Sequence, residues 1–362
     1  MSKRILIKGN QAIGEAAMRA GCKAYFGYPI TPQSELLEYM AEELPKRGGV
    51  FVQSESELAG ASMVYAAAGT GVRAMTSSSS PGISLMQEVL SCTAAAEVPA
   101  LWVNISRGGP GMGRIVPAQS DYFQATRGGG HGDYRMFVLG PSTVREMAEL
   151  TILGFELAEK WRVPAMLLGD AMTGQCMESI EEECLEPKNP PCEKPWAATG
   201  MKDYGEDDPR TEIHRILNHP YTDPELITQN IRFSEKYKQI QETEIRWEEY
   251  RADDAEILIA AFGIVARFAK TAVDLLREEG CKVGLFRPIT LWPYPSAPLK
   301  KLAEHCRTIL TMEMNEGQMV EDVKLAVNGA CPVDFDGHGG GYILNPFEMA
   351  DLIKDKYFGG KE

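Results

Sequence analysis

Short apolar runs alternate with longer amphipathic segments through the first half of the chain. Between most of these runs the spacing of apolar positions changes from about two residues, typical of strands, to about 3.6, typical of helices. Strict alternation of strand and helix predicts an α/β fold with a doubly wound parallel sheet, whose ligands bind at the carboxyl ends of the strands. The predicted strands are 5–7, 24–28, 50–53, 73–76, 100–105, 136–139 and 165–168.

Several helix starts are marked by residues that cap helices well. A side-chain oxygen before the first turn accepts a hydrogen bond from a free backbone N–H, and proline fits the first helical position. The predicted caps are Asn10 for 11–20, which Gly21 ends, Thr31 with Pro32 for the next helix, Ser142 for 143–161 and Thr222 for a long polar helix reaching about residue 250.

The composition of the sequence changes near residue 178. Glu, Pro, Lys and Asp dominate there, and apolar residues recur without a regular spacing. Alternation then resumes in a second, smaller α/β region. Its predicted strands are 257–261, 282–286, 308–312 and 333–335, and its predicted helices are 267–279, 297–305 and 319–327. The expected division is therefore a first domain over 1–178, an extended connector and polar helix over 179–253, and a second domain over 254–362.

The charge and the apolar runs exclude several classes of protein. A net charge of -14 opposes binding to phosphate backbones or anionic lipid, so neither nucleic acid nor a membrane is expected as a partner. The longest nearly uncharged run, 257–266, is too short to span a bilayer and is interpreted as a buried strand. The first ten residues show no targeting pattern, so a cytoplasmic location is expected.

No two of the 8 cysteines have the spacing of a zinc or iron-sulfur site, and no metal site is predicted in this chain. The closest group, Cys176, Cys184 and Cys192, has no histidine near it. Free thiols in a reducing compartment are the better interpretation.

Four segments with unusual polar composition follow predicted strands of the first domain. They are 28–32, 53–57, 76–82 and 106–113. Because parallel strands end at one edge of a sheet, these segments are expected to converge on one ligand site.

Glu55 is the candidate acid–base group of this site. A carboxylate at a buried strand end acquires a raised pKa suited to sharing a proton with a ring nitrogen. The alternative is an early-turn glutamate favoured by the helix dipole, an interpretation that fits Glu57 better. Arg107 follows an apolar strand and is suited to bidentate capture of a carboxylate, unless it is a solvated surface arginine.

Small hydroxyl side chains fill the run from Thr76 to Ser80. They would allow a flat ring or a diphosphate to approach the backbone, although the run is also compatible with a simple turn. The glycines of 108–113 and 337–341 do not lead into a helix and therefore fail as dinucleotide-binding fingerprints. A mobile loop over a ligand is expected for 108–113, and His131 is either a titrating base or a structural hydrogen-bonding residue.

Taken together, these motifs resemble the alpha-type subunit of 2-oxoacid:ferredoxin oxidoreductases. The resemblance is carried by Gly9-Asn10-Gln11-Ala12, Tyr28-Pro29-Ile30-Thr31-Pro32, Gln53-Ser54-Glu55, the segment 76–82 and Ser120-Asp121-Tyr122. It implies that the first domain is a pyrimidine-binding domain of the thiamine diphosphate type and that the second is similar to the C-terminal domain of transketolases.

The resemblance also implies roles for individual residues. Glu55 would hydrogen-bond the aminopyrimidine ring as the catalytic residue, and Thr31 and Arg107 would bind the substrate. Tyr28, Pro29, Ile30, Ser78 and Ser79 would complete the cofactor-binding surface.

The Gly-Asp-Gly signature that holds the diphosphate and Mg²⁺ in thiamine enzymes has no match, since Gly169-Asp170-Ala171 is the nearest segment. The resemblance therefore implies that thiamine diphosphate is shared with a beta subunit, and that Mg²⁺ and iron-sulfur clusters lie in partner subunits only. A gamma subunit, a small ferredoxin-like subunit, coenzyme A and external ferredoxin are the other expected partners.

Branched-chain 2-oxoacids such as 3-methyl-2-oxobutanoate are the expected substrates, on the phrases Gly128 to Tyr134 and Lys194 to Ala197. Pyruvate and 2-oxoglutarate remain alternatives, the latter if Arg114, Arg127 and Arg135 gather at the site. Two rival functions are a nicotinamide or flavin oxidoreductase and a non-catalytic scaffold.

Overall fold

The first sheet is parallel along its main strand order except at one edge, which confirms the predicted doubly wound architecture. The computed structural model describes residues 3–199, 216–217, 220 and 222–359. In the strand order β13-β7-β8-β5-β4-β2-β3, every neighbouring pair except β13–β7 is parallel. The strands are β2 (Ala24–Gly27), β3 (Val50–Gln53), β4 (Ala74–Ser78), β5 (Leu101–Gly108), β7 (Phe137–Leu139), β8 (Ala165–Asp170) and β13 (Thr290–Trp292).

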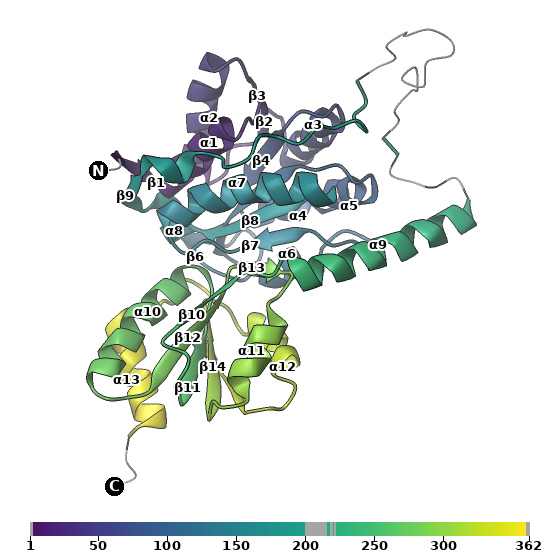
Figure 1. Cartoon of the computed structure of the whole chain (residues 1–362). Helices are drawn as coiled ribbons and strands as arrows, with labels where there is room; N and C mark the ends of the chain where they lie inside the picture. The colour runs from purple at the N-terminus through teal and green to yellow at the C-terminus, as the bar shows by residue number, and fades with distance from the viewer. Residues whose placement is uncertain (1–2, 200–215, 218–219, 221, 360–362) are drawn as a thin grey trace.

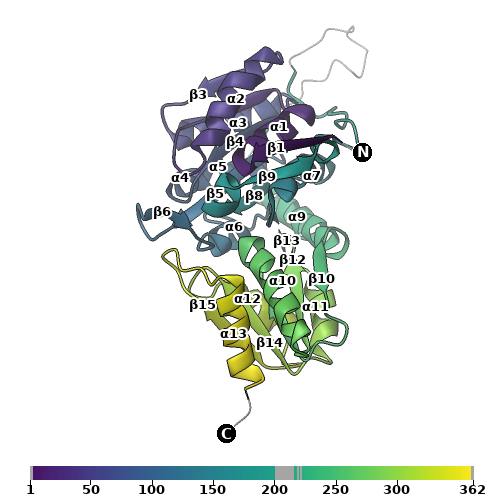
Figure 2. The same cartoon turned by 90° about the vertical axis from the view of Figure 1, so that its left-hand side faces the viewer.

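Helices cover both faces of this sheet (Figures 1 and 2). On one face α1 (Gly9–Arg19) packs against α2 (Ser34–Lys46) and α7 (Val144–Trp161). On the other face α3 (Glu57–Gly69) packs against α4 (Pro81–Leu85) and α5 (Gln87–Ala95). The sheet is therefore sealed from water on both sides, and large side chains such as Trp102 and Phe137 are fully buried in it.

The first predicted strand exists but does not join the parallel sheet. β1 (Arg4–Lys8) pairs antiparallel with β9 (Met177–Glu181) in a separate two-stranded ribbon. Only Ile7 of β1 is buried, whereas Leu6 is 69% exposed. A strand with a single buried residue lacks the apolar faces that an internal parallel strand needs.

Two predicted helix caps were wrong and one was a residue early. Asn10 lies inside α1, where its buried side-chain amide donates to the Pro32 carbonyl oxygen at 3.0 Å. α2 begins at Ser34, so neither Thr31 nor Pro32 starts it. Thr143 rather than Ser142 caps α7, because its hydroxyl accepts the Glu146 N–H. For Asn10 a tertiary contact, and for Ser142 the neighbouring Thr143 hydroxyl, replaces the cap that local preference favoured.

The second sheet has the order β10-β12-β11-β14-β15, with β10 antiparallel at the edge. Helices α10 and α13 pack on one face and α11 and α12 on the other (Figure 1). The predicted buried strand 257–266 was too long, because α10 already begins at Gly263. None of the described helices could cross a membrane. The elements are β10 (Trp247–Tyr250), β11 (Ile257–Ala260), β12 (Val283–Pro288), β14 (Thr308–Glu313), β15 (Val333–Gly337), α10 (Gly263–Glu278), α11 (Ser296–Ala303), α12 (Met319–Val327) and α13 (Pro346–Tyr357).

The connection between the two sheets is more structured than the sequence indicated. After β9 come a 3-10 turn (Glu182–Leu185) and then α9 (Asp223–Thr243), whose predicted cap, Thr222, forms a capping box with Glu225. The part of the expected connector over 200–215 lies outside the described residues. β10 takes the place of the last predicted helical turns. Because β13 returns to the first sheet before the chain continues to β14, the chain passes between the two units three times.

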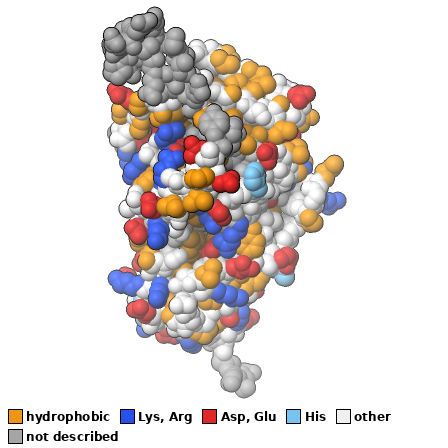
Figure 3. Space-filling model, turned by 90° about the vertical axis from the view of Figure 1, so that its right-hand side faces the viewer, with side chains coloured by type: hydrophobic (Ala, Val, Ile, Leu, Met, Phe, Trp, Pro, Cys, Tyr) orange, Lys and Arg blue, Asp and Glu red, His pale blue; other side chains and the backbone are white. Residues whose placement is uncertain are grey.

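The buried side chains of α9 lie from the middle of the helix onward. Phe233, Tyr237 and Ile240 are buried, and Tyr237 stacks edge-on against Trp292 at 5.7 Å. In its first half, Ile227 and Ile231 are 61% and 56% exposed. Figure 3 views the molecule from the side on which α9 projects, where hydrophobic side chains lie among charged ones.

A buried ion cluster fastens the connector to the first domain. Arg73 donates to both carboxylate oxygens of Glu159, at 2.7 and 2.6 Å, and Lys194 lies 2.6 Å from the same carboxylate. Burial would raise the pKa of Glu159, but hydrogen bonds from Arg73 and Lys194 outweigh it and hold the pKa below its usual value. The cluster therefore favours the charged carboxylate in the folded protein.

Glu159→Gln is expected to lower the free energy of unfolding by about 3 kcal/mol at neutral pH, because two buried cations lose their carboxylate. A carboxyl whose pKa is depressed on folding stabilises above its unfolded pKa, and that stabilisation is lost as pH falls through the folded pKa. The free energies of unfolding of the parent and the variant should therefore become similar at acid pH. Urea denaturation at neutral and acid pH measures this difference. Glu149→Gln, which removes an exposed pair with Arg145, is the control and should change stability by less than about 1 kcal/mol.

Candidate functional site

The polar strand ends of the first domain meet where the sheet changes winding direction. From β2 the chain passes through α2 to β3 on one side, and then through α3 to β4 on the other side of β2. The carboxyl ends of β2 and β4 therefore border the crevice in which open α/β sheets bind ligands. Segments 28–32 and 76–82 follow these two strands, as the sequence predicted.

Buried hydroxyl groups without partners line the end of β4. Thr76, Ser78 and Ser79 are all 0% exposed, and none of their hydroxyl oxygens has a hydrogen-bond partner among the described residues. Buried polar groups are rarely left unpaired, since each costs about 1–3 kcal/mol. Such a cluster at a sheet's ligand crevice is typical of a surface that hydrogen-bonds a ligand.

The acid beside these hydroxyls is Glu57, not Glu55. Glu57 is 7% exposed at the start of α3, whereas Glu55 lies exposed in the turn that follows β3. Gly82 has no side chain, and a Cβ atom there would lie 2.0 Å from Ser78 Oγ and 2.7 Å from Glu57 Oε1. The burial expected for Glu55 is therefore wrong. The Glu57 carboxylate forms no hydrogen bond or ion pair with another described residue.

Thr31 and Arg107 come together at the same rim. The Arg107 guanidinium donates to the backbone oxygens of Thr31, at 2.8 Å, and Met112, at 2.9 Å. Its third donor, Nε, is buried without a partner. Arg107 is therefore held by neutral carbonyl groups and keeps its charge for an anion.

The other expected cofactor residues form the outer lip of the crevice. Tyr28 is 37% exposed, Pro29 is exposed and Ile30 is half-buried. The Gln33 side-chain amide donates to the Tyr28 carbonyl oxygen at 3.1 Å and fixes the turn after β2. The lip thus presents apolar surface outward.

The glycines of 108–113 form the turn of a hairpin. β6 (Arg114–Pro117) pairs antiparallel with the end of β5, so the segment does not lead into a helix, as predicted. At its tip Met112 and Ile115 are 83% and 57% exposed. The hairpin projects from the rim in Figure 2.

The remaining candidates do not converge on this crevice. His131 is exposed, and its carbonyl oxygen accepts a hydrogen bond from Ser91. Arg127 is paired with Asp322 of the second domain at 2.9 Å, and Arg135 lines a separate hollow beside α9. Arg114 lies exposed on β6. The three arginines therefore do not make a joint anion site.

A cleft of about 700 Å³ lies between the rim and the second domain. Asp121 and Glu316 contribute carboxylates to it, and no lysine or arginine lines it among the described residues. Its lining residues are Ser80, Pro81, Ser84, Gly109, Pro110, Gly111, Ser120, Asp121, Gln124, Asn315, Glu316, Gln318, Gly339 and Gly340. The cleft suits an uncharged group better than a second anion.

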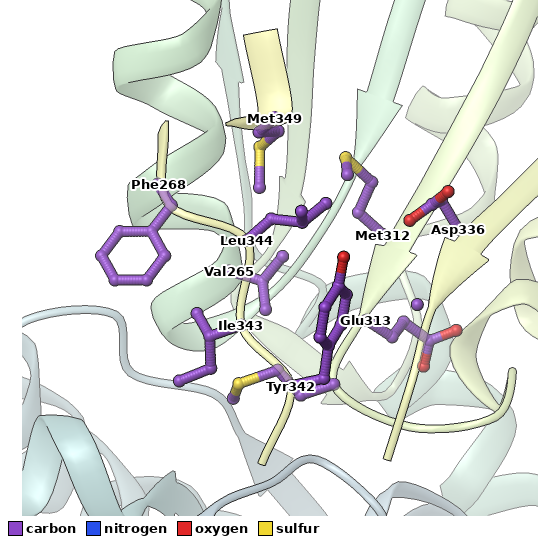
Figure 4. A pocket seen from close by; sticks show the side chains of 11 residues that line it. Val265, Phe268, Met312, Glu313, Asp336, Tyr342, Ile343, Leu344 and Met349 are labelled. Carbon is purple, nitrogen blue, oxygen red and sulfur yellow. The ribbon is translucent and has the colours of Figure 1, made fainter. Parts of the chain in front are cut away.

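The second domain offers much less room. A void of about 20 Å³ is enough for a water molecule only. Figure 4 shows the side chains that line it, among them Val265, Met312 and Tyr342. Beside it the buried Glu313 carboxylate accepts the Met319 and Val320 N–H groups at 2.7 and 3.0 Å, at the start of α12. Burial raises the pKa of Glu313 against these hydrogen bonds.

The segment nearest to a diphosphate–metal motif has a structural role. Asp170 ends β8, and its carboxylate accepts the Met172 and Thr173 N–H groups that begin α8 (Ala171–Gln175). Burial raises the pKa of this carboxyl. No group of three or more His, Cys, Asp or Glu side chains is placed to hold a metal ion in the described ranges.

A family model described as pyruvate flavodoxin/ferredoxin oxidoreductase, thiamine diphosphate-binding, matches residues 15–251. The chain belongs to this family. The model for pyruvate:ferredoxin oxidoreductase core domain II matches residues 255–349, so the second half is similar to this family as well. The expected family is confirmed, and the chain carries its thiamine diphosphate-binding domain.

Relatives extend this similarity over nearly the whole chain. Ketoisovalerate oxidoreductase subunit VorB of Methanothermobacter marburgensis is 45% identical over 352 residues, which cover 96% of each protein. The 2-oxoglutarate synthase subunit KorA of Methanocaldococcus jannaschii is 36% identical, covering 96% of this chain and 98% of that subunit.

Solved structures share the fold. A 2-oxoglutarate:ferredoxin oxidoreductase from Magnetococcus marinus superposes with a TM-score of 0.85 at 27% identity, covering 98% of this chain and 65% of that one. A split-gene transketolase matches with a TM-score of 0.60 at 13% identity, covering 96% of this chain and 97% of that one. The predicted transketolase-like architecture is confirmed.

The crevice fits one end of thiamine diphosphate. Unpaired hydroxyls and a carboxylate are suited to the polar edge of an aminopyrimidine ring, and Gly82 leaves space beside them. The diphosphate end would need a divalent cation with oxygen ligands. No such ligand cluster occurs among the described residues, so the fit is limited to the pyrimidine side.

Proposed function

We propose that this chain is the subunit of a 2-oxoacid:ferredoxin oxidoreductase that binds the substrate and the pyrimidine end of the coenzyme. The proposed reaction converts a 2-oxoacid and coenzyme A to acyl-CoA and CO₂, with electrons passed to ferredoxin. The observation that carries the proposal is the buried Glu57 carboxylate beside unpaired hydroxyls in the ligand crevice of the first sheet.

Glu57 is the catalytic residue of this proposal and replaces Glu55 in the role expected from the sequence. Bound thiamine diphosphate supplies the electron sink that allows a 2-oxoacid to lose CO₂. Glu57 would hold a proton at a ring nitrogen of the aminopyrimidine, where a carboxylate shielded from water is an effective proton partner. Ser78 and Ser79 would hydrogen-bond the ring edge through their free hydroxyl groups.

The substrate carboxylate is assigned to Arg107, with Thr31 beside it. The guanidinium already emerges at the rim, and its contacts with carbonyl oxygens leave its positive charge uncompensated. A carboxylate arriving there would exchange a neutral acceptor for a charged one, which roughly doubles the strength of a hydrogen bond.

Glu57→Gln, in the complex assembled with its companion chains, is expected to lower kcat by about 10² to 10⁴, because the amide cannot exchange the proton. Glu55→Gln is the matched control on the same turn and should stay within a few-fold of the parent. Both are measured as 2-oxoacid-dependent reduction of ferredoxin or a viologen dye. Activity of the Glu57 variant near that of the parent would instead support a non-catalytic scaffold.

Arg107→Leu should raise the KM for the 2-oxoacid by at least about tenfold, since a charge-assisted hydrogen bond contributes about 1.5–3 kcal/mol. The affinity for thiamine diphosphate should change little. Initial rates over a range of 2-oxoacid concentrations, and over a range of thiamine diphosphate concentrations, separate these two effects. An unchanged KM would remove Arg107 from the substrate site.

Partner chains are proposed to complete the coenzyme site. Apart from Glu57 and Ser62, the side chains of α3 are mostly apolar around its circumference, yet Leu58 and Met63 on it are 46% and 37% exposed, and Leu85 on α4 is 58% exposed. A helix of this kind is normally buried on all sides. A beta subunit that binds the diphosphate and Mg²⁺ would cover this surface next to Glu57.

The remaining partners follow the same proposal. A gamma subunit and a small ferredoxin-like subunit would make up the complex, and iron-sulfur clusters in partner subunits would carry electrons to external ferredoxin. The complex would work in the cytoplasm.

Branched-chain 2-oxoacids are the proposed substrates. The cleft beside Ser80 carries two carboxylates and, in the described part of the chain, no lining lysine or arginine, which disfavours the second carboxylate of 2-oxoglutarate. A site for that second carboxylate is also disfavoured because Arg114, Arg127 and Arg135 lie apart from one another. The greater identity to the ketoisovalerate subunit than to the 2-oxoglutarate subunit supports this choice.

The purified complex should turn over 3-methyl-2-oxobutanoate with a kcat/KM at least about tenfold above that for 2-oxoglutarate, equivalent to about 1.4 kcal/mol of transition-state discrimination. Pyruvate, which has a smaller side chain, should lie between them. Parallel assays with equal enzyme measure the ratio. A preference for 2-oxoglutarate would overturn the substrate assignment and leave the reaction class standing.

A further inference from the structure

Gln119 is a residue of the first domain that inserts into the second. It is 3% exposed, and each of its four polar groups is paired with the second domain. Its side-chain amide donates to the Phe262 carbonyl oxygen at 2.9 Å and accepts the Met314 N–H at 3.0 Å. Its backbone N–H donates to the Met314 carbonyl oxygen at 3.0 Å, and its own carbonyl oxygen accepts the Asn315 side-chain amide at 3.0 Å.

The place that Gln119 occupies is the ligand crevice of the second sheet. Phe262 follows β11 and Met314 follows β14, two adjacent parallel strands from which the chain leaves toward opposite faces, through α10 and α12. This is the switch point at which such sheets bind ligands. Gly263 begins α10 there, and a Cβ on it would lie 3.0 Å from Gln119 Nε2. The crevice is therefore filled by the chain itself.

Asp121, two positions after Gln119, links this contact to the ligand crevice of the first domain. One carboxylate oxygen of Asp121 accepts the Ser80 hydroxyl at 2.6 Å and the Asn104 side-chain amide at 2.9 Å. Asn104 Oδ1 in turn accepts the Ser80 N–H at 3.1 Å. Ser80 also contacts the backbone of Arg107, whose N–H donates to the Ser80 hydroxyl at 3.0 Å.

We propose that Gln119 is a positioning residue, which anchors segment 119–121 in the second sheet and thereby holds Asp121 on the turn that follows β4. That turn directly follows Ser78 and Ser79, so the second domain sets the geometry of the pyrimidine side without contacting the coenzyme. The hydrogen bonds given above support the link from Gln119 to the turn after β4. The effect of this link on catalysis rests on the proposed function.

The test compares two variants with a control in the assembled complex, by hydrogen–deuterium exchange read by mass spectrometry. Gln119→Met keeps the length of the side chain and removes its amide. It should speed exchange of the amides of both 79–84 and 314–320 by about tenfold, since buried hydrogen bonds are lost at both ends of the link. Asp121→Ala cuts the link beyond Gln119 and should speed exchange in 79–84 only.

Tyr122→Phe is the control. It removes another hydrogen bond across the same domain boundary, from the Tyr122 hydroxyl to Asp322 at 2.7 Å, and leaves the contacts of Gln119 and Asp121 in place. Its exchange in 79–84 should match the parent. In both linked variants the Kd for thiamine diphosphate should rise by about tenfold, whereas in Tyr122→Phe it should not change.

Parent-like exchange of 79–84 in either Gln119→Met or Asp121→Ala would overturn the proposal, as would equal acceleration by Tyr122→Phe. If Gln119→Met does not assemble, Gln119→Asn replaces it, because the shorter amide cannot reach both Phe262 and Met314, and the same outcomes decide. The exchange measurement does not depend on turnover. A failure of this inference is therefore distinguishable from a failure of the role given to Glu57, which the Glu57→Gln assay reports.

Discussion

Unpaired buried hydroxyl groups at the end of β4 are the constraint on which the rest of the structure depends. A parallel sheet covered by helices on both faces leaves no water at its centre, so polar groups carried into the crevice need partners. Thr76, Ser78 and Ser79 have none among the described residues. The first domain therefore keeps an energetic cost that bound coenzyme and a covering subunit would remove. In the proposed complex, activity and assembly would therefore be coupled through this one surface.

The second domain has the same architecture, but the polar groups in its crevice are paired within the chain. Its switch-point crevice receives Gln119, and its helix amides at α12 receive Glu313, so the polar groups at both places are satisfied from within the chain. Two sheets of similar topology therefore have different roles. One is open to a ligand, and the other has become a rigid support whose ligand crevice is used to hold the first domain.

The burial of the two acids illustrates why a residue pattern alone could not decide which carboxylate faces the crevice. Glu55 and Glu57 are two positions apart on one turn, and local sequence favoured Glu55 because it follows the strand directly. The chain bends at residues 54–56, where the Ser54 hydroxyl donates to the Ser56 carbonyl oxygen and Ser56 caps α3. That bend turns Glu55 to solvent and carries Glu57 inward beside Gly82. The inward position is decided by contacts with α4, which lies 25 residues further along the chain.

The sequence by itself determined the fold class, nearly all core strands and the rim on which the polar segments meet, because apolar periodicity and strand–helix alternation are local signals. It also indicated the family, since the order of several short motifs is recorded in the chain. Tertiary structure decided which acid is buried, that Thr31 does not cap a helix, that β1 leaves the main sheet and that Gln119 closes the second crevice. Each of these depends on atoms brought together from distant parts of the chain, and the free energy of such contacts leaves no periodic trace in the sequence.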